Sequence, residues 1–225
     1  MTLAVITAMY LYTVASPMYA QTQKPQTFNE ILKHRSKQWN DFIDNVYKLH
    51  VKRLDTVDHI IEETVGGYGG VTNDLEFYRE ERFYEKTSGR LLSVIRWEKK
   101  NPANLHEIEL YVYDKEGRIL REYAATFLPS RRAAPFHTLI TQHYYSGDIH
   151  SFREFDASND RLYEQCQKIS DPKHVYFALH YEDIPYSYRD IEPSRQQQYR
   201  ACFDQLAKTA VPFTNPMAEL EEQVR

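Results

Sequence analysis

Three histidines in one predicted β-hairpin are the residues of this chain best suited to chemistry, because imidazole exchanges protons near neutral pH and ligates metals. The two-residue turn of this hairpin is either Ser146-Gly147 or Gly147-Asp148, and each turn gives one pairing register. Both registers pair odd positions with even ones, so His137, His143 and His150 fall on one face together with Tyr145. Imidazoles beside an aromatic ring suit a metal, a sugar ring or a peptide.

The spacing of these histidines favours a binding surface over a metal centre. His143 and His150 are the only close pair, and no third ligand stands at a spacing that is diagnostic of a metal site. We therefore predict no metal ion and no other cofactor. The alternative is that the histidines are half-exposed strand residues without a function of their own.

A loop dense in Tyr, Asp and Arg, residues 182–190, is the second candidate site. Aromatic rings offer contact area and charges give direction, so such loops often carry recognition. We predict Tyr186, Tyr188 and Arg189 as binding residues. The alternative is a solvated connection bounded by Pro185.

Acidic residues close in sequence, Glu80 with Glu81 and Glu107 with Glu109, do not predict an acid–base pair. Adjacent strand residues point to opposite faces, which separates the first two, and the second two form an exposed row. The chain also contains no nucleophile elbow, zinc-protease helix, P-loop or dinucleotide fingerprint.

These observations favour an exported, non-catalytic module. It would bind a protein, a glycan or a small molecule of the cell envelope through its tyrosine-rich sheet and the loop 182–190. The chain has 18 Tyr and 11 Phe, which supply surface that is apolar in body and polar at the tip. The alternative is a small exported enzyme, such as a hydrolase, with a histidine and carboxylate site between the sheet and the N-terminal helix.

The first twenty residues predict export. Leu3 to Ala15 is an almost uninterrupted apolar run, Pro17 follows it, and Ala20 offers a small residue for cleavage before Gln21. The positive segment that normally begins a signal peptide is missing. The alternative is a membrane anchor over residues 2–20. We favour a cleaved signal peptide over residues 1–20, and therefore a periplasmic or secreted protein.

The two cysteines, Cys166 and Cys202, are predicted to form a disulfide, since export places them in an oxidising compartment. Closing a loop of this length stabilises a fold by about 4 kcal/mol in the loop-entropy model. Two buried free thiols are the alternative for a chain that stays in the cytosol.

Composition indicates one globular domain over residues 21–210, followed by a flexible C-terminal tail over 211–225. A content of 42% apolar and 27% charged residues is ordinary for a folded chain. The net charge of −4 gives no electrostatic support for nucleic acid as a partner. Contact with a membrane is expected only if the N-terminus stays uncleaved.

A long amphipathic helix is predicted to open the domain. Thr27–Glu30 has the spacing of a capping box, and apolar residues then recur every three or four positions to Val65. Such a helix would be longer than a compact domain needs, so we expect a break near Asp55-Thr56, both good cap residues. A core-facing helix is favoured over a coiled coil because the heptad fails at Arg35 and Arg53.

From Leu75 the apolar pattern has a period of two, which is typical of strands. Gly66–Gly70 marks the joint between the helix and the first strand, and the turns that follow end in Gly89 and Gly117, suited to a left-handed conformation. Short turns build an antiparallel meander, since parallel strands need long crossovers. Pro193 opens the last helix. The expected strands are 75–85, 90–99, 105–113, 118–127, 136–145, 149–155, 161–166 and 175–181.

The predicted fold class is therefore α+β: a long N-terminal helix packed on an antiparallel β-meander of about six to eight strands, with a C-terminal helix. The face of the third hairpin opposite the histidines is expected to join the core. Its members are Phe136, Ile140, Tyr144, Ile149 and Phe155.

Overall fold

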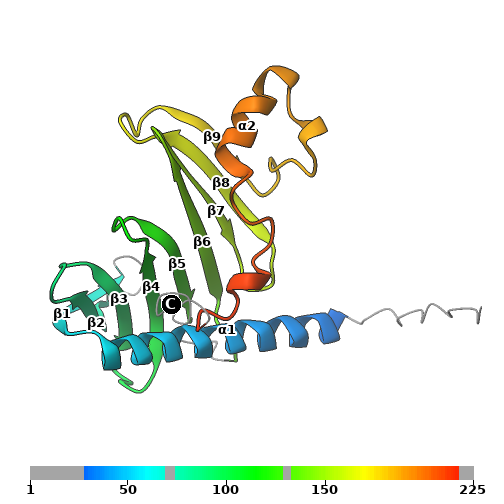
Figure 1. The fold of residues 1–225 in the computed structure, drawn as a ribbon. Helices are drawn as coiled ribbons and strands as arrows, with labels where there is room; N and C mark the ends of the chain where they lie inside the picture. The colour runs from blue at the N-terminus through cyan, green and yellow to red at the C-terminus, as the bar shows by residue number, and fades with distance from the viewer. Residues whose placement is uncertain (1–27, 69–73, 129–132, 218–225) are drawn as a thin grey trace, which may run out of the picture.

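The computed structural model describes residues 28–68, 74–128 and 133–217. A long helix is followed by a nine-stranded antiparallel sheet, in which each strand pairs with the next along the chain, and by a short helix (Figure 1). The elements are α1 (Phe28–Thr56), β1 (His59–Tyr68), β2 (Asp74–Glu85), β3 (Leu91–Glu98), β4 (Leu105–Tyr113), β5 (Ile119–Thr126), β6 (His137–Ser146), β7 (Ile149–Phe155), β8 (Arg161–Lys168), β9 (Val175–His180) and α2 (Gln196–Phe203).

The α+β class and the order of helix, sheet and helix are confirmed, but the sheet has nine strands rather than six to eight. The expected break in the helix is present, because α1 ends at Thr56. The chain then continues as strand β1, so the inclusion of Ile60, Ile61 and Val65 in the helical pattern is wrong. β-branched residues fit a pleated strand, and pairing with β2 supplies partners for the backbone.

Glycines mark turns of the meander as predicted. Gly89, Gly117 and Gly147 have φ angles of 71°, 83° and 56°, which a residue without a Cβ adopts most readily. Gly66 lies inside β1, so a strand and not a helix precedes the glycine-rich segment. The predicted capping residue Thr27 lies outside the described residues.

The main core lies between α1 and one face of the sheet (Figure 1). The apolar stripe of the helix is buried there, so α1 faces the core as predicted. Ile140 and Phe155 are buried as expected, whereas Phe136 is 62% exposed and its prediction as core is wrong. Phe136 precedes β6, where the alternation of faces no longer applies. The buried apolar residues of the helix are Phe42, Ile43, Val46 and Leu49.

The two arginines that interrupt the heptad of α1 attach the helix to the rest of the molecule. Arg53 is buried, and its Nη1 donates to the carbonyl of Tyr111 at 2.6 Å. Near the other end, Arg35 pairs with Asp156 and, at 3.1 Å, with Asp160. Charged residues within the apolar stripe thus anchor α1 rather than oppose its packing.

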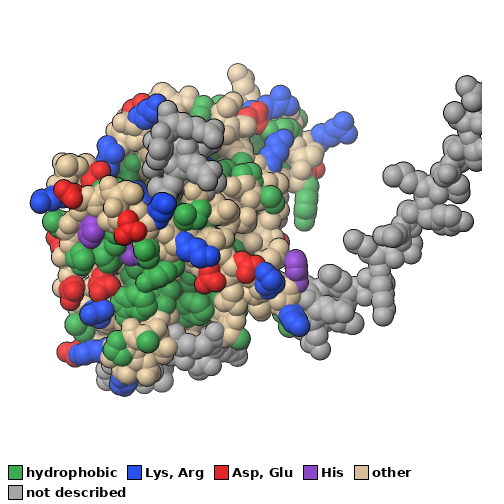
Figure 2. All heavy atoms as spheres, turned by 60° about the horizontal axis from the view of Figure 1, so that its bottom comes forward, with side chains coloured by type: hydrophobic (Ala, Val, Ile, Leu, Met, Phe, Trp, Pro, Cys, Tyr) green, Lys and Arg blue, Asp and Glu red, His purple; other side chains and the backbone are tan. Residues whose placement is uncertain are grey.

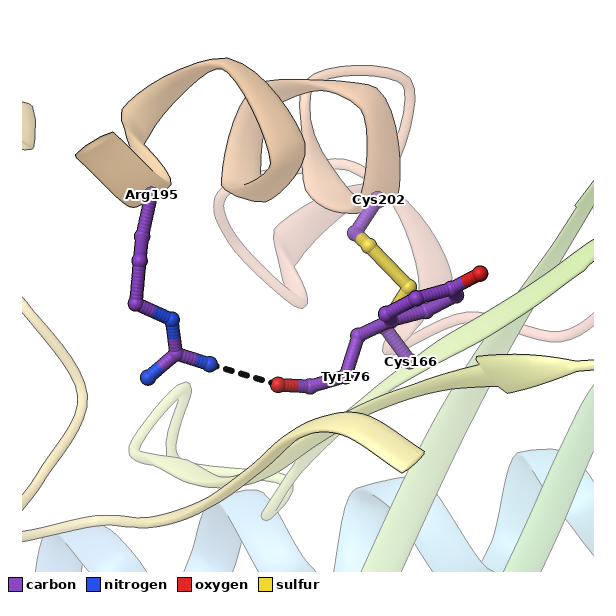
Figure 3. Close-up of a disulfide and its surroundings, with 4 residues drawn as sticks. All are labelled: Cys166, Tyr176, Arg195 and Cys202. Atoms are coloured by element: carbon purple, nitrogen blue, oxygen red, sulfur yellow. Dashed lines mark hydrogen bonds between the residues drawn. A yellow bond between two sulfur atoms is a disulfide. The ribbon is translucent and has the colours of Figure 1, made fainter. Parts of the chain in front are cut away.

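A second, smaller core lies between α2 and strands β8 and β9. The predicted disulfide is present and joins Cys166 of β8 to Cys202 of α2, with both residues fully buried (Figure 3). Around it pack Phe177, Tyr199 and Phe203. An eight-residue helix is marginal in isolation, so these tertiary contacts must hold α2 in place.

A buried carboxylate, Glu164 of β8, connects the sheet to α2. It accepts hydrogen bonds from Arg153 Nε at 2.5 Å, from Arg161 Nη1 at 3.0 Å and from the hydroxyl of Tyr199 at 2.6 Å. Arg153 also donates to the carbonyl of Ala207 at 2.8 Å. Burial and the Glu164 carboxylate raise the pKa of Tyr199, which keeps its hydroxyl a donor.

The segment after α2 returns to the main core. The backbone amide of Ala210 donates to Asn159 Oδ1 at 2.5 Å, and Phe213 and Met217 pack against the core cluster. Residues 211–217 of the predicted tail therefore lie against the sheet and α1, and the rest of that tail is outside the described residues.

Replacing Glu164 with Gln should destabilise the fold by about 3 kcal/mol, because the buried Arg153 loses the one carboxylate that pairs with it within the described residues. Urea unfolding measures the loss. The matched control is Asp41→Asn, which breaks the exposed Lys37–Asp41 pair and should cost less than about 0.5 kcal/mol. Equal effects of the two substitutions would contradict the role given to Glu164.

The fold should lose stability in mild acid because of His50. This residue is 5% exposed, and burial, with the nearby His59 and Arg53, lowers its pKa to about 4. The unfolded chain binds this proton near pH 6.5, so the stability from neutral His50 is present above that pH and is lost as the pH falls toward 4. Between pH 7 and pH 5 the loss should be about 2 kcal/mol.

Urea unfolding at both pH values tests this expectation. His50→Gln should remove about 2 kcal/mol of the pH dependence, whereas His34→Gln, at an exposed position of the same helix, should leave it unchanged. An unaltered pH dependence in His50→Gln would exclude His50 as the cause.

Candidate functional site

A cleft of about 510 Å³ lies between α2, the loop before it and strands β7 and β8. The loop brings the predicted residues Tyr186, Tyr188 and Arg189 to its wall. We call it the cationic cleft, because basic side chains dominate its charged lining: Arg153, Arg161, Arg189, Arg200 and Lys208.

Part of this positive charge is compensated and part is not. Arg153 and Arg161 both pair with Glu164, which is fully buried and does not itself line the cleft. Arg189, Arg200 and Lys208 have no carboxylate within ion-pair distance in the part of the chain that the structure describes. Three cations without a protein counter-ion therefore border one small space.

The loop at the cleft is held by its own hydrogen bonds. The side chain of Ser187 accepts from the amide of Arg189 at 3.0 Å, and Asp190 Oδ2 accepts from the amide of Ser187 at 2.8 Å. Tyr188 donates to Asp204, and the Arg200 guanidinium lies 4.7 Å from the centre of the Tyr188 ring. Tyr186 is fully exposed at the rim.

The cleft has the chemistry of a binding site. Arginine and lysine stay protonated at neutral pH and suit a carboxylate, phosphate or sulfate group. Tyr186 and Tyr188 add aromatic surface for an apolar or ring-shaped part of a ligand. No histidine, aspartate or glutamate is among the described residues that line the cleft.

The histidine pair lies elsewhere, on the sheet face opposite α1. Tyr145 pairs with His150, which puts both next to His143 on one face as predicted. The Nδ1 of His143 is 3.0 Å from Nε2 of His150, and its Nε2 is 3.1 Å from a carboxylate oxygen of Glu122. Tyr145 stacks on His150 with ring centres 4.6 Å apart.

These contacts place protein groups around the histidines. Burial and the adjacent His143 lower the pKa of His150 to about 4. The His143 side chain is 9% exposed, and each of its ring nitrogens lies near a protein group, which leaves little access for a substrate. The enzyme alternative expects its site between the sheet and the N-terminal helix, whereas His143 and His150 lie on the other face of the sheet.

His137 is separate from this pair. It lines a shallow hollow of about 420 Å³ with His180, Tyr163 and Glu154. Burial, and then the Glu122 carboxylate, raise the pKa of Glu154. The three predicted histidines therefore share a face without forming one site.

A third hollow, of about 640 Å³, lies between α1 and the sheet and is lined mostly by Ile43, Tyr47, Trp97, Leu105 and Phe127. Figure 2 views the molecule from the side of α1 and shows hydrophobic side chains gathered on this surface. The groove is apolar, but nothing around it indicates a particular ligand.

The sequence analysis does not identify four basic residues of the cationic cleft, Arg153, Arg161, Arg200 and Lys208. They come from β7, from β8, from α2 and from the chain after α2. The sequence contains one signal that points to Arg200. Gln196 and Arg200 are one helical turn apart, so they lie on one face of the last helix, and both line the cleft. The approach of β8 to α2 depends on the disulfide and on Glu164, which a helical pattern does not reveal.

Within the described residues, no group of three or more His, Cys, Asp or Glu side chains is arranged to hold a metal ion. The same part of the chain contains no helix that is long and apolar enough to cross a membrane. Comparison with protein families, with curated proteins and with solved structures finds no match for this chain.

Proposed function

We propose that this protein is an exported, non-catalytic binding module that takes an anionic group into the cationic cleft. The observation that carries the proposal is the convergence of Arg189, Arg200 and Lys208, without protein counter-ions among the described residues, beside Tyr186 and Tyr188. Unpaired cations at a concave surface attract anions and recognise them by charge-assisted hydrogen bonds.

The size of the cleft supports a small ligand or a side group of a larger one. A volume of about 510 Å³ is within the range of small-molecule sites. A charge-assisted hydrogen bond from each of the three cations contributes about 2 kcal/mol to binding. Together these bonds correspond to a Kd in the millimolar to micromolar range. The tyrosines favour an anion that carries a ring, such as an aromatic phosphate or an acidic sugar.

Export is supported by two independent features. The disulfide between Cys166 and Cys202 is compatible with an oxidising compartment. The apolar N-terminal run up to Ala20 has the pattern of a cleaved signal peptide, although it lies outside the described residues. In such a compartment the partner would be an acidic glycan, a protein or a small molecule of the cell envelope.

Phenyl phosphate tests the cleft, with phenol as the uncharged control ligand. Titration followed by amide chemical shifts should move resonances of the 186–189 loop with phenyl phosphate and not with phenol. Arg200→Ala and Lys208→Ala should each weaken binding about tenfold, because each removes a charged contact. Lys115→Ala, at an exposed hairpin turn, is the matched control and should bind as the parent chain does.

The proposed site would be excluded if phenol moved the same resonances equally. Unchanged affinity in the folded Arg200→Ala and Lys208→Ala variants would have the same meaning. The amide spectrum itself reports whether each variant is folded.

Intact mass tests export. Expressed in a secreting host, the chain should begin at Gln21, and alkylation should modify Cys166 and Cys202 only after reduction. A mass that includes residue 1, with both cysteines alkylated before reduction, would contradict export and leave binding at the cleft as a separate question.

A further inference from the structure

The sheet is open, so its first and last strands, β1 and β9, are edges (Figure 1). An edge strand presents unpaired N–H and C=O groups to which another strand can bind. Folded proteins commonly cover or block such edges. The two edges of this sheet differ in this respect.

The edge at β9 is covered by the chain that follows it. Arg195 Nη2 donates to the carbonyl of Tyr176 at 2.6 Å (Figure 3). The carbonyl of His180 accepts from the amides of Asp183 at 2.8 Å and Ile184 at 3.1 Å. These bonds occupy backbone groups of β9 at two points and block the addition of a strand there.

Among the described residues, none covers the edge at β1 in this way. The carbonyl of Asp58 accepts from the amide of Lys86, so even-numbered residues of β1 bond to β2 and odd-numbered residues point away from the sheet. The outward groups are those of Ile61, Glu63 and Val65. None of these three residues has a further backbone hydrogen bond within the described part of the chain.

The side chains of β1 also favour an additional strand. Ile60, Ile61 and Val65 are 48%, 50% and 53% exposed. Ile61 lies opposite the buried Phe83, so an apolar residue placed beside Ile61 would extend the main core. β1 thus combines a free hydrogen-bonding edge with exposed apolar side chains on both faces.

Charge decides between possible occupants of this edge. Glu62 and Glu63 are exposed at the middle of β1 and have no ion pair among the described residues. Only odd-numbered residues of β1 point outward, so a second copy paired antiparallel must set odd positions opposite odd ones and even positions opposite even ones. Registers centred on residue 62 or 63 then place Glu62 opposite Glu62 or Glu63 opposite Glu63, and like charges directly opposite destabilise a sheet. A strand with basic residues at these two positions has the opposite effect.

We infer that β1 is a docking edge for an extended segment of a partner protein, in which two adjacent basic residues are flanked by apolar ones. An antiparallel partner strand places the basic residues opposite Glu63 and Glu62 and apolar residues opposite Val65, Ile61 and Ile60. The pattern of such a segment is Val-Thr-Lys-Lys-Ile-Val. Backbone hydrogen bonds provide affinity, and the two acidic residues provide selectivity.

Residue-resolved amide hydrogen exchange of the full chain tests this inference, with a synthetic peptide that contains Val-Thr-Lys-Lys-Ile-Val as probe. In the free protein the amides of Ile61, Glu63 and Val65 should exchange fast. The peptide should slow these amides and leave those of Ile60 and Glu62 unchanged, because these already bond to β2. A peptide with Glu-Glu in place of Lys-Lys should bind about tenfold more weakly.

Two variants provide controls. The double substitution Glu62→Lys and Glu63→Lys should reverse the preference between the two peptides. Ile61→Pro removes an outward N–H, which edge strands tolerate, so this variant should fold and lose peptide binding.

Three outcomes would overturn the inference. The first is slow exchange at Ile61, Glu63 and Val65 in the free protein, which would show that a second copy or the chain itself already covers the edge. The second is equal binding of the two peptides. The third is no change of exchange at millimolar peptide.

Discussion

The buried carboxylate of Glu164 is the contact on which the C-terminal part of the molecule depends. It accepts from two arginines of the sheet and from Tyr199 of α2, so one side chain fixes the distance between two layers. The disulfide adds a covalent link beside it. The cationic cleft has its floor on the sheet and a wall on α2, and its shape therefore follows from these contacts. They also neutralise Arg153 and Arg161, which leaves Arg189, Arg200 and Lys208 as the charge available to a ligand.

The face of the sheet opposite α1 is stabilised by its own long side chains rather than by a second layer. Arg96 lies among Glu80, Glu107 and Glu109 and pairs with all three. Burial alone would lower the pKa of Arg96, but these carboxylates outweigh it and raise the pKa. Val94 is only 3% exposed on this face, which shows how closely the side chains cover it. The stacked histidines continue the same covering, so residues suited to chemistry serve packing here.

The sequence predicted those features that depend on local patterns. Turn glycines set the hairpins, and the period of two placed His143 and His150 on one face. Prediction failed where partners distant in the chain decide the outcome. The apolar spacing of Ile60, Ile61 and Val65 predicts helix for the segment that forms β1, and only pairing with β2 selects the strand. Likewise, the loop residues Tyr186, Tyr188 and Arg189 were identified from composition, but the basic residues opposite them come together only through the packing of α2 on the sheet.

The distribution of charge explains why net charge alone is a poor guide to the partners of this chain. The total of −4 argues against polyanions as a class, yet the unpaired charges are separated along the sheet. Cations without protein counter-ions gather beside β7 and β8, and Glu62 and Glu63 lie on β1 at the far edge. The two regions thus have opposite charge, and five strands, β2 to β6, lie between β1 and β7. A ligand in the cleft would neither touch nor electrostatically block a strand bound at β1, because salt screens charges beyond about 10 Å.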